Sequence, residues 1–203
     1  ILIVDDCSTD NTVELASQLA AADPRIRVLS TPSNSGGPGA PRNIGLEEAR
    51  GRFITLLDSD DVLERHACIN LLREAERTAV DVVMDQTQRL DVAKDKPFGW
   101  HRRLYLEPRT VDSIEDDVEL AIDTIAVAKL YKREFLRSNG LRFPEGLHYE
   151  DLVFSARMFQ AARGISVLRE VVYIWKIYPT VVRQSITHQR DSIRNLEQRL
   201  EAL

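Results

Sequence analysis

The stretch Phe53-Ile-Thr-Leu-Leu57, followed by Asp58-Ser-Asp-Asp61, decides the fold. Five consecutive apolar or β-branched residues predict a strand that is buried on both faces, as in a sheet covered by helices on either side. The carboxylates that follow stand at the carboxyl end of this strand, which is where open α/β sheets bind their ligands. The stretch therefore predicts an α/β protein with an acidic site at one edge of its sheet.

Apolar periodicity extends this pattern along the chain. It predicts strands over 1–4, 26–29, 53–57, 81–86, 165–168 and 171–175, and helices over 11–21, 42–50, 63–77, 113–123, 132–138, 150–162 and 191–203. Strands and helices alternate over the first 86 residues, which predicts a mostly parallel, doubly wound central sheet flanked by helices. Residues 91–109 show no such pattern, and we expect a mobile or family-specific segment there.

The composition is that of an ordinary globular domain of 203 residues, with 43% hydrophobic and 29% charged residues. A net charge of -5 argues against nucleic acid as the main partner, because that binding needs clustered Lys and Arg. No apolar run approaches the roughly 20 residues that span a bilayer. The two isolated cysteines, Cys7 and Cys68, fit a reducing compartment. We therefore expect a cytoplasmic protein without a transmembrane segment.

Asp58 and Asp60 form the strongest candidate site. In extended backbone, residues i and i+2 face the same way, so both carboxylates can point at one ligand. Hard oxygen donors suit Mg²⁺ or Mn²⁺, whose remaining ligands are commonly waters and substrate phosphates. The simpler alternative is an acidic turn that caps the next helix. The cost of burying several carboxylates without a cation favours the metal site.

Two polar loops could hold a nucleotide. Asp5-Asp6-Cys-Ser-Thr-Asp10 ends the first strand, and a carboxylate there could accept hydrogen bonds from a base, although the loop also fits a plain helix cap. Asn34-Ser-Gly-Gly-Pro-Gly-Ala-Pro-Arg-Asn43 contains glycines that let backbone approach a ligand, and Arg42 at a helix start suits a diphosphate. The glycine spacing matches neither the dinucleotide-binding fingerprint nor the Walker loop.

Two further segments carry candidate groups near the end of the chain. His148-Tyr-Glu-Asp151 begins an amphipathic helix, where acidic residues either complement the helix dipole or supply a general base. Arg183-Gln-Ser-Ile-Thr187 forms a polar loop after Pro179. Local sequence leaves both alternatives open for the first segment and assigns no role to the second.

In this order, the segments 4–12, 34–43, 58–61 and Glu150-Asp151 resemble the inverting family 2 glycosyltransferases of the GT-A fold. The loop at 34–39, Phe143-Pro-Glu145 and Ile165-Ser-Val-Leu168 are most similar to bacterial enzymes that attach N-acetylglucosamine to wall teichoic acid. The resemblance covers most of residues 1–187 and fades over 87–126. It implies a catalytic domain over 1–190, which lacks the family's first strand and helix, and a separate C-terminal helix over 191–203.

The resemblance implies a donor-binding role for four residues. Asp6 would bind the uracil of a nucleotide-sugar, and Asn34 and Arg42 would line the nucleotide. Arg183 would steady the diphosphate. The expected donor is a UDP-sugar such as UDP-GlcNAc.

The resemblance also implies the catalytic groups. Asp58, Ser59 and Asp60 would form the Asp-x-Asp motif, in which Asp58 and Asp60 bind Mn²⁺ or Mg²⁺. Asp151 would be the base that takes the acceptor's proton, with Glu150 beside it to orient the sugar or the acceptor.

The expected acceptor is a hydroxyl group of a carbohydrate or polyol phosphate, such as a cell-wall glycopolymer, reached by an enzyme that is at most peripheral at the inner membrane face. Two alternatives stay open: a nucleotidyltransferase of related fold, and a nucleotide-binding module without catalysis. In the first alternative Asp151 would have no essential role.

Overall fold

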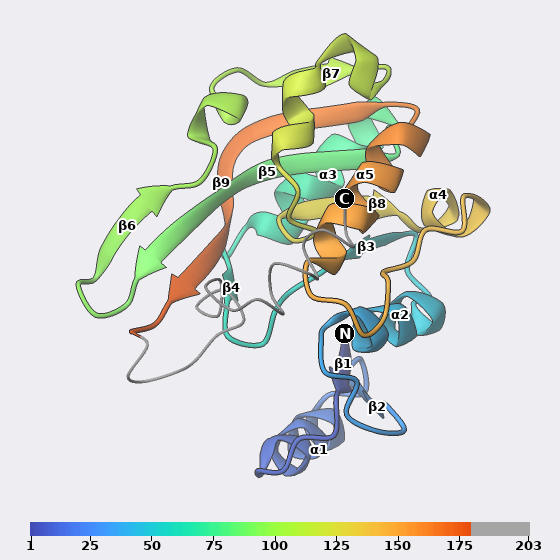
Figure 1. The fold of residues 1–203 in the computed structure, drawn as a ribbon, viewed down its shortest axis with the longest axis vertical. Helices are drawn as coiled ribbons and strands as arrows, with labels where there is room; N and C mark the ends of the chain where they lie inside the picture. Colours follow the sequence, from blue (N-terminus) through green and yellow to red (C-terminus); the bar gives the residue numbers. More distant parts are fainter. Residues whose placement is uncertain (180–203) are drawn as a thin grey trace.

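The computed structural model describes residues 1–179 (Figure 1). The predicted helix over 191–203 and the candidate Arg183 lie outside the described residues. The first unit of the fold consists of β1 (Leu2–Asp5) and β2 (Arg27–Ser30), joined by α1 (Thr12–Ala22). The two strands pair in parallel, with Leu2 opposite Arg27, as the helical crossover between them requires. This unit confirms the strand, helix and strand expected at the start of the chain.

A second sheet forms the body of the molecule. Its strands follow the order β3 (Phe53–Thr55), β8 (Lys129–Lys132), β5 (Val82–Asp91), β9 (Ile165–Ile177) and β4 (Val62–Leu63), with β6 (Lys96–Gly99) paired to β5 and β7 (Arg109–Val111) paired to β9. Within this sheet of the described chain, only β5 and β9 pair in parallel.

The expectation of a mostly parallel sheet is therefore wrong for the body of the molecule, although the α/β class holds. The reason lies in the connections. Parallel neighbours need a crossover, usually a helix, and the strand and helix alternation stops after β5. Beyond that point loops and short 3₁₀ turns return the chain in the opposite direction, so β6 and β8 pair antiparallel to β5.

Helices cover both faces of this sheet. They are α2 (Gly39–Glu48), α3 (Ala67–Thr78), α4 (Arg133–Ser138) and α5 (Glu150–Ala161), with 3₁₀ turns η1 (Arg102–Tyr105), η2 (Ile114–Asp116) and η3 (Val118–Ile122). Val82 packs into one core with Phe154 of α5, whereas its neighbour Val83 packs into the other core with Leu71 of α3. Successive residues of β5 thus serve opposite faces, as the period of a strand requires.

Several element boundaries differ from the predictions. The helix expected from residue 63 begins at Ala67, because Val62 and Leu63 form β4 against β9. The strands predicted over 165–168 and 171–175 are one strand, and its pairing with β5 shifts register between Met84 and Gln86. The helix predicted over 113–123 is two 3₁₀ turns. Strand β6 and turn η1 lie within residues 91–109, where the sequence shows no pattern. Helix α2 begins three residues early, at Gly39.

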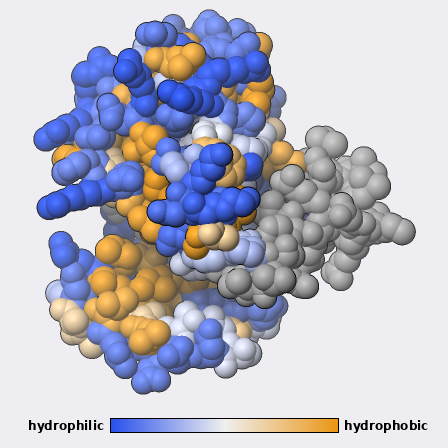
Figure 2. All heavy atoms as spheres, turned by 90° about the vertical axis from the view of Figure 1, so that its left-hand side faces the viewer, coloured by the Kyte–Doolittle hydropathy of each residue, from blue (hydrophilic) through white to orange (hydrophobic). Residues whose placement is uncertain are grey.

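The N-terminal unit has an apolar surface. Ile1, Leu15 and Leu19 are each more than half exposed, and Figure 2 shows apolar side chains gathered on the lower part of the molecule, where Figure 1 places β1, β2 and α1. No helix within residues 1–179 is long and apolar enough to cross a membrane.

Candidate active site

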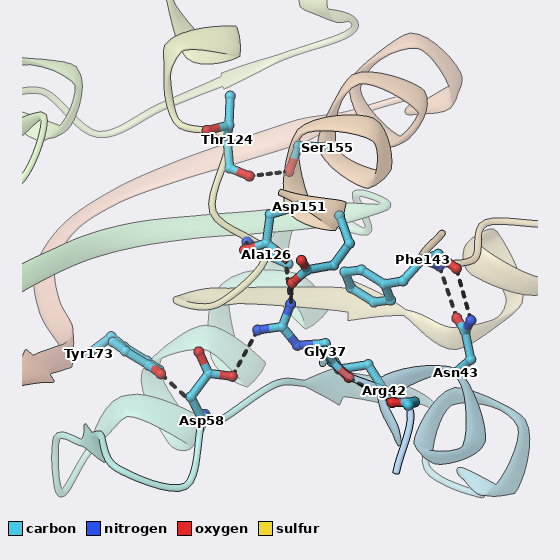
Figure 3. A network of polar contacts seen from close by, with 12 residues as sticks. Gly37, Arg42, Asn43, Asp58, Thr124, Ala126, Phe143, Asp151, Ser155 and Tyr173 are labelled. Atoms are coloured by element: carbon cyan, nitrogen blue, oxygen red, sulfur yellow. Dashed lines mark hydrogen bonds and ion pairs between the residues drawn. The ribbon is translucent and has the colours of Figure 1, made fainter. Parts of the chain in front are cut away.

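Three carboxylates from two distant segments meet at Arg42 (Figure 3). Nη1 of Arg42 donates hydrogen bonds to Oε1 of Glu150 at 2.8 Å and to Oδ1 of Asp151 at 2.5 Å, and Nη2 donates to Oδ1 of Asp58 at 2.8 Å. The Arg42 side chain is only 11% exposed. Helix α2, the end of β3 and the start of α5 therefore converge on a single cation. The structure brings together four residues that the sequence predicted for the site.

The charges at this point do not balance. Burial opposes the charge of Arg42, but the carboxylates of Asp151, Asp58 and Glu150 outweigh it and raise the pKa of Arg42 above its usual value. Burial and the neighbouring Asp151 raise the pKa of Glu150 to about 7, although Arg42 acts in the opposite direction. One positive group thus faces three acidic groups. A further cation at this place would lower the energy of the ionised carboxylates.

Asp151 is held through both of its carboxylate oxygens. Oδ1 accepts from Arg42, and Oδ2 accepts from the backbone N–H of Ala126 at 3.0 Å. Ala126 is fixed in turn, because the hydroxyl of Tyr131 donates to its carbonyl at 2.7 Å and Ser155 of α5 donates to the carbonyl of Thr124 at 2.8 Å. A carboxylate oriented in this way at the start of a helix can accept a proton from a fixed direction.

A buried ion pair supports the segment that holds Asp151. Nζ of Lys129 lies 3.2 Å from Oδ1 of Asp123, and neither side chain is exposed to solvent. Lys129 also donates to the carbonyl of Ile125 at 2.5 Å, and Tyr105 donates its hydroxyl proton to Asp123. The residues from Asp123 to Ala126 are thereby anchored beneath the site. Sequence reasoning missed this pair, because neither residue stands in a motif and nothing in the local sequence shows that either charge is buried.

The acidic motif after β3 is folded into a turn by Tyr173. The Tyr173 hydroxyl accepts from the N–H of Asp58 at 3.2 Å and donates to Oδ2 of Asp61 at 2.7 Å, while the N–H of Lys176 donates to Oδ1 of Asp61 at 2.8 Å. Burial raises the pKa of Asp61 to about 6 despite these bonds. Asp61 therefore shapes the turn, which leaves Asp58 and Asp60 as the carboxylates for a ligand. Sequence reasoning also missed Tyr173, whose only distinguishing feature in the sequence is a hydroxyl group within an apolar strand.

The acidic motif fits a divalent cation that a substrate helps to hold. Asp58 and Asp60 supply hard oxygen donors and are half-buried. In the part of the chain that the structure describes, no three His, Cys, Asp or Glu side chains form a group that could hold a metal ion by themselves. Two carboxylates completed by waters and substrate phosphates are the usual ligands of Mg²⁺. The donor set thus matches a metal that arrives with a diphosphate.

Asp6 and Asn34 tie the glycine-rich loop to the end of β1. The carboxylate of Asp6 accepts from the hydroxyl of Thr31 at 2.7 Å and from the N–H and hydroxyl of Ser35 at 3.0 and 2.9 Å. Asn34 donates its side-chain amide to the carbonyl of Asp6 at 2.8 Å. Asp5, which is buried, accepts from the N–H of Ser8 instead. A contact between Asp6 and uracil stays a prediction.

Close packing of α2 sets the direction of Arg42. Asn43, which is buried, exchanges two hydrogen bonds of 2.9 Å with the backbone N–H and carbonyl of Phe143. At Gly39 an added Cβ would lie 2.3 Å from the carbonyl oxygen of Pro144, so only glycine fits there. The Arg42 guanidinium lies 5.2 Å from the centre of the Phe143 ring. These contacts lock the first turn of α2 onto residues 143–145.

Comparison with known proteins identifies the family. Residues 1–140 match the family model described as Glycosyl transferase family 2. The chain belongs to glycosyltransferase family 2. The family predicted from the four motifs is thus confirmed, and a chain of this family is classed among the glycosyltransferases.

Two relatives have names that specify poly(ribitol-phosphate). The poly(ribitol-phosphate) beta-N-acetylglucosaminyltransferase TarS of Staphylococcus aureus is 28% identical over 176 residues, which are 86% of this chain and 29% of that protein. The poly(ribitol-phosphate) beta-glucosyltransferase of Bacillus spizizenii is 27% identical over 179 residues, which are 87% of this chain and 27% of that protein. The chain therefore spans less than a third of the length of either relative. The predicted likeness to bacterial N-acetylglucosaminyltransferases of this kind is confirmed.

Solved structures confirm the predicted GT-A class within family 2. A crystal structure of S. aureus TarS residues 1–349 has a TM-score of 0.77 and 26% identity, over 86% of this chain and 50% of that one. The same TarS region in complex with UDP-GlcNAc has a TM-score of 0.82 and 24% identity, over 99% of this chain and 55% of that one. Both support the mixed α/β architecture described above.

Proposed function

We propose that this family 2 protein is a metal-dependent inverting glycosyltransferase that uses a UDP-sugar, such as UDP-GlcNAc, as donor. The observation that carries the proposal is the ion network of Figure 3, in which Arg42 joins the candidate base Asp151 to the candidate metal ligand Asp58. A displacement needs the base and the leaving-group site on either side of one reacting carbon. The name of the relative TarS supports N-acetylglucosamine as the transferred sugar.

The donor side of the proposed site lies at the ends of β1 and β3. Asp6 and Asn34 shape the loop that would face the nucleotide. Asp58 and Asp60, with Ser59 between them, would hold Mg²⁺ or Mn²⁺. Arg183, in the segment after β9, is proposed to steady the diphosphate, and residues 1–190 to form one catalytic domain.

The proposed chemistry is a single displacement. Asp151 takes the proton of an acceptor hydroxyl while that oxygen forms its bond to the anomeric carbon. The bond between this carbon and the diphosphate oxygen breaks on the opposite face, so the configuration inverts and the nucleoside diphosphate leaves. Bound Mg²⁺ or Mn²⁺ would supply Lewis-acid stabilisation of the leaving diphosphate. Glu150 orients the acceptor or the sugar, and no second protein acid is needed.

The proposed acceptor is a hydroxyl group on a polyol-phosphate polymer or a related carbohydrate. Support comes from the relatives of S. aureus and B. spizizenii, whose names both specify poly(ribitol-phosphate). Such a reaction fits a cytoplasmic enzyme that is at most peripheral at the inner face of the membrane.

Calorimetric titration of UDP into the protein, with and without Mn²⁺, tests the donor site. We expect binding that depends on Mn²⁺ and is lost in Asp60→Ala. Asp112→Ala is the matched control, because the Asp112 side chain is exposed. A positive result leads to a screen of UDP-sugars for transfer to poly(ribitol phosphate). Absence of binding to UDP, GDP, CDP and dTDP alike would contradict the proposal.

A further inference from the structure

We infer that Arg42 is a positioning residue that holds the base Asp151 in place and couples it to the occupancy of the donor site at Asp58. The inference rests on the proposed function, because it assigns Asp151 as base and Asp58 as a ligand on the donor side. The resemblance implies that Arg42 lines the nucleotide, and that role stays a prediction. In the structure its guanidinium contacts three carboxylates, all within 2.8 Å.

The shape of the guanidinium is what this arrangement uses. Two protons on Nη1 serve Glu150 and Asp151, and a proton on Nη2 serves Asp58. A planar fork can satisfy carboxylates in different directions at once, whereas the ammonium of lysine is a point charge on a flexible stem. The N–H of Ala126 fixes the other oxygen of Asp151. The base is therefore clamped from two sides, and Arg42 is one of them.

The uneven charge of the network supplies the coupling. Arg42 carries one positive charge for three acidic groups, so each carboxylate is only partly compensated. When cation and diphosphate occupy the donor side, Asp58 gains a second positive partner and depends less on Arg42. The charge of Arg42 is then shared between Glu150 and Asp151 alone. Coupling between two sites is reciprocal. A change at Arg42 must therefore alter both the effect of donor binding on Asp151 and the effect of Asp151 on donor binding.

Kinetics of Arg42→Lys separate this role from a nucleotide contact. A shift of the base by about 1 Å lowers turnover by roughly 10²-fold, so we expect kcat to fall by that factor. The KM for the UDP-sugar and the Kd for UDP with Mn²⁺ should change by less than about threefold, because lysine keeps the positive charge beside the donor site. Arg142→Lys is the control, since Arg142 is 52% exposed and forms an ion pair with Glu47, outside the site. A parallel loss of UDP affinity, or unchanged kcat, would overturn the inference.

A second measurement tests the network without turnover. In double-mutant cycles of unfolding, Arg42→Lys is combined with Asp151→Asn, with and without UDP and Mn²⁺, and separately with Asp58→Asn in the absence of ligands, because Asp58→Asn removes a proposed metal ligand. We expect both pairs to be non-additive without ligands, and the coupling between Arg42 and Asp151 to increase when UDP and Mn²⁺ are bound. Additive effects throughout would overturn the inference. If the wild-type protein transfers no sugar from any donor, the proposed function fails while these cycles still report on the network.

Discussion

Two ion networks lie close together in this molecule and differ in their burial and in their charge balance. Around Lys129, one ammonium meets one carboxylate, Asp123, and both are fully buried. Around Arg42, one guanidinium meets three carboxylates whose side chains are 8%, 22% and 40% exposed. The hydroxyl of Tyr105 and the carbonyl of Ile125 satisfy the first network further. The second keeps excess negative charge beside solvent.

This difference separates scaffold from site. A balanced ion pair carries no net charge to attract a ligand, and removal of one partner leaves a buried charge that destabilises the fold. An unbalanced network at the surface gains energy when a cation arrives. The Lys129 pair therefore stabilises the fold, whereas the Arg42 network serves binding and chemistry. The pair also supports the network, because it anchors residues 123–126. The following changes test that assignment.

The largest effect is expected for Asp151→Asn. Without the base, kcat should fall by about 10²–10⁴-fold. The free energy of unfolding should fall only by about 1–3 kcal/mol, because the single oxygen of asparagine can accept from either Arg42 or the N–H of Ala126 but not from both. Transfer assays beside urea unfolding measure the two quantities, and UDP affinity in the presence of Mn²⁺ should stay as in the wild type. Unchanged transfer would remove Asp151 as the base and favour a nucleotidyltransferase or a binding module.

Lys129→Met is expected to act mainly on stability. It leaves Asp123 buried without its cation, which lowers the free energy of unfolding by about 3–5 kcal/mol. The double variant with Asp123→Asn should recover much of this loss. Lys94→Met is the control, since Lys94 is 73% exposed and its pairing with Asp91 contributes about 1 kcal/mol or less. Equal losses in both lysine variants would show that the Lys129 pair is not the anchor inferred here.

The two networks also differ in what the sequence could predict. Asp58 and Asp60 stand in an acidic motif at a strand end, where the α/β pattern predicts a site, whereas the place of Glu150 and Asp151 in that site was implied by the resemblance to family 2. Arg42 was found at a predicted helix start, but its partners were not, because Glu150 and Asp151 lie more than 100 residues further along the chain. Lys129 and Asp123 were missed, because nothing local distinguishes a buried charge from an exposed one.

The fold was predictable where local pattern and connection agree. The unit of β1, α1 and β2 was predicted nearly to the residue, because a helical crossover fixes parallel pairing. The order and direction of the later strands depend on tertiary pairing. Leu63 has helical spacing with the residues that follow, yet it pairs with Tyr173 of β9. Local periodicity cannot reveal a pairing partner that lies 110 residues further along the chain.

Two tyrosines allow the two sides of the Arg42 network to be weakened separately. Tyr173→Phe removes the hydroxyl that bonds Asp61 and the N–H of Asp58, and Tyr131→Phe removes the one that bonds the carbonyl of Ala126. Each change should lower the free energy of unfolding by about 1–3 kcal/mol. We expect the first to weaken UDP binding with Mn²⁺ and the second to lower kcat. The same functional defect in both would argue against two separable sides.

The smallest effect concerns the pH dependence of stability. Glu150 has a pKa of about 7 in the folded protein, above its ordinary value of 4.5. The folded state therefore binds this proton more tightly than the unfolded state does, and the free energy of unfolding falls as pH rises between these two values. Glu150→Gln should reduce this slope between pH 4.5 and 7 in urea unfolding. Part of the slope should remain, because burial also raises the pKa of Asp61 to about 6 and that of Asp85 to about 8. If Glu150→Gln leaves the lower slope unchanged, the excess negative charge assigned to the Arg42 network does not reside on Glu150.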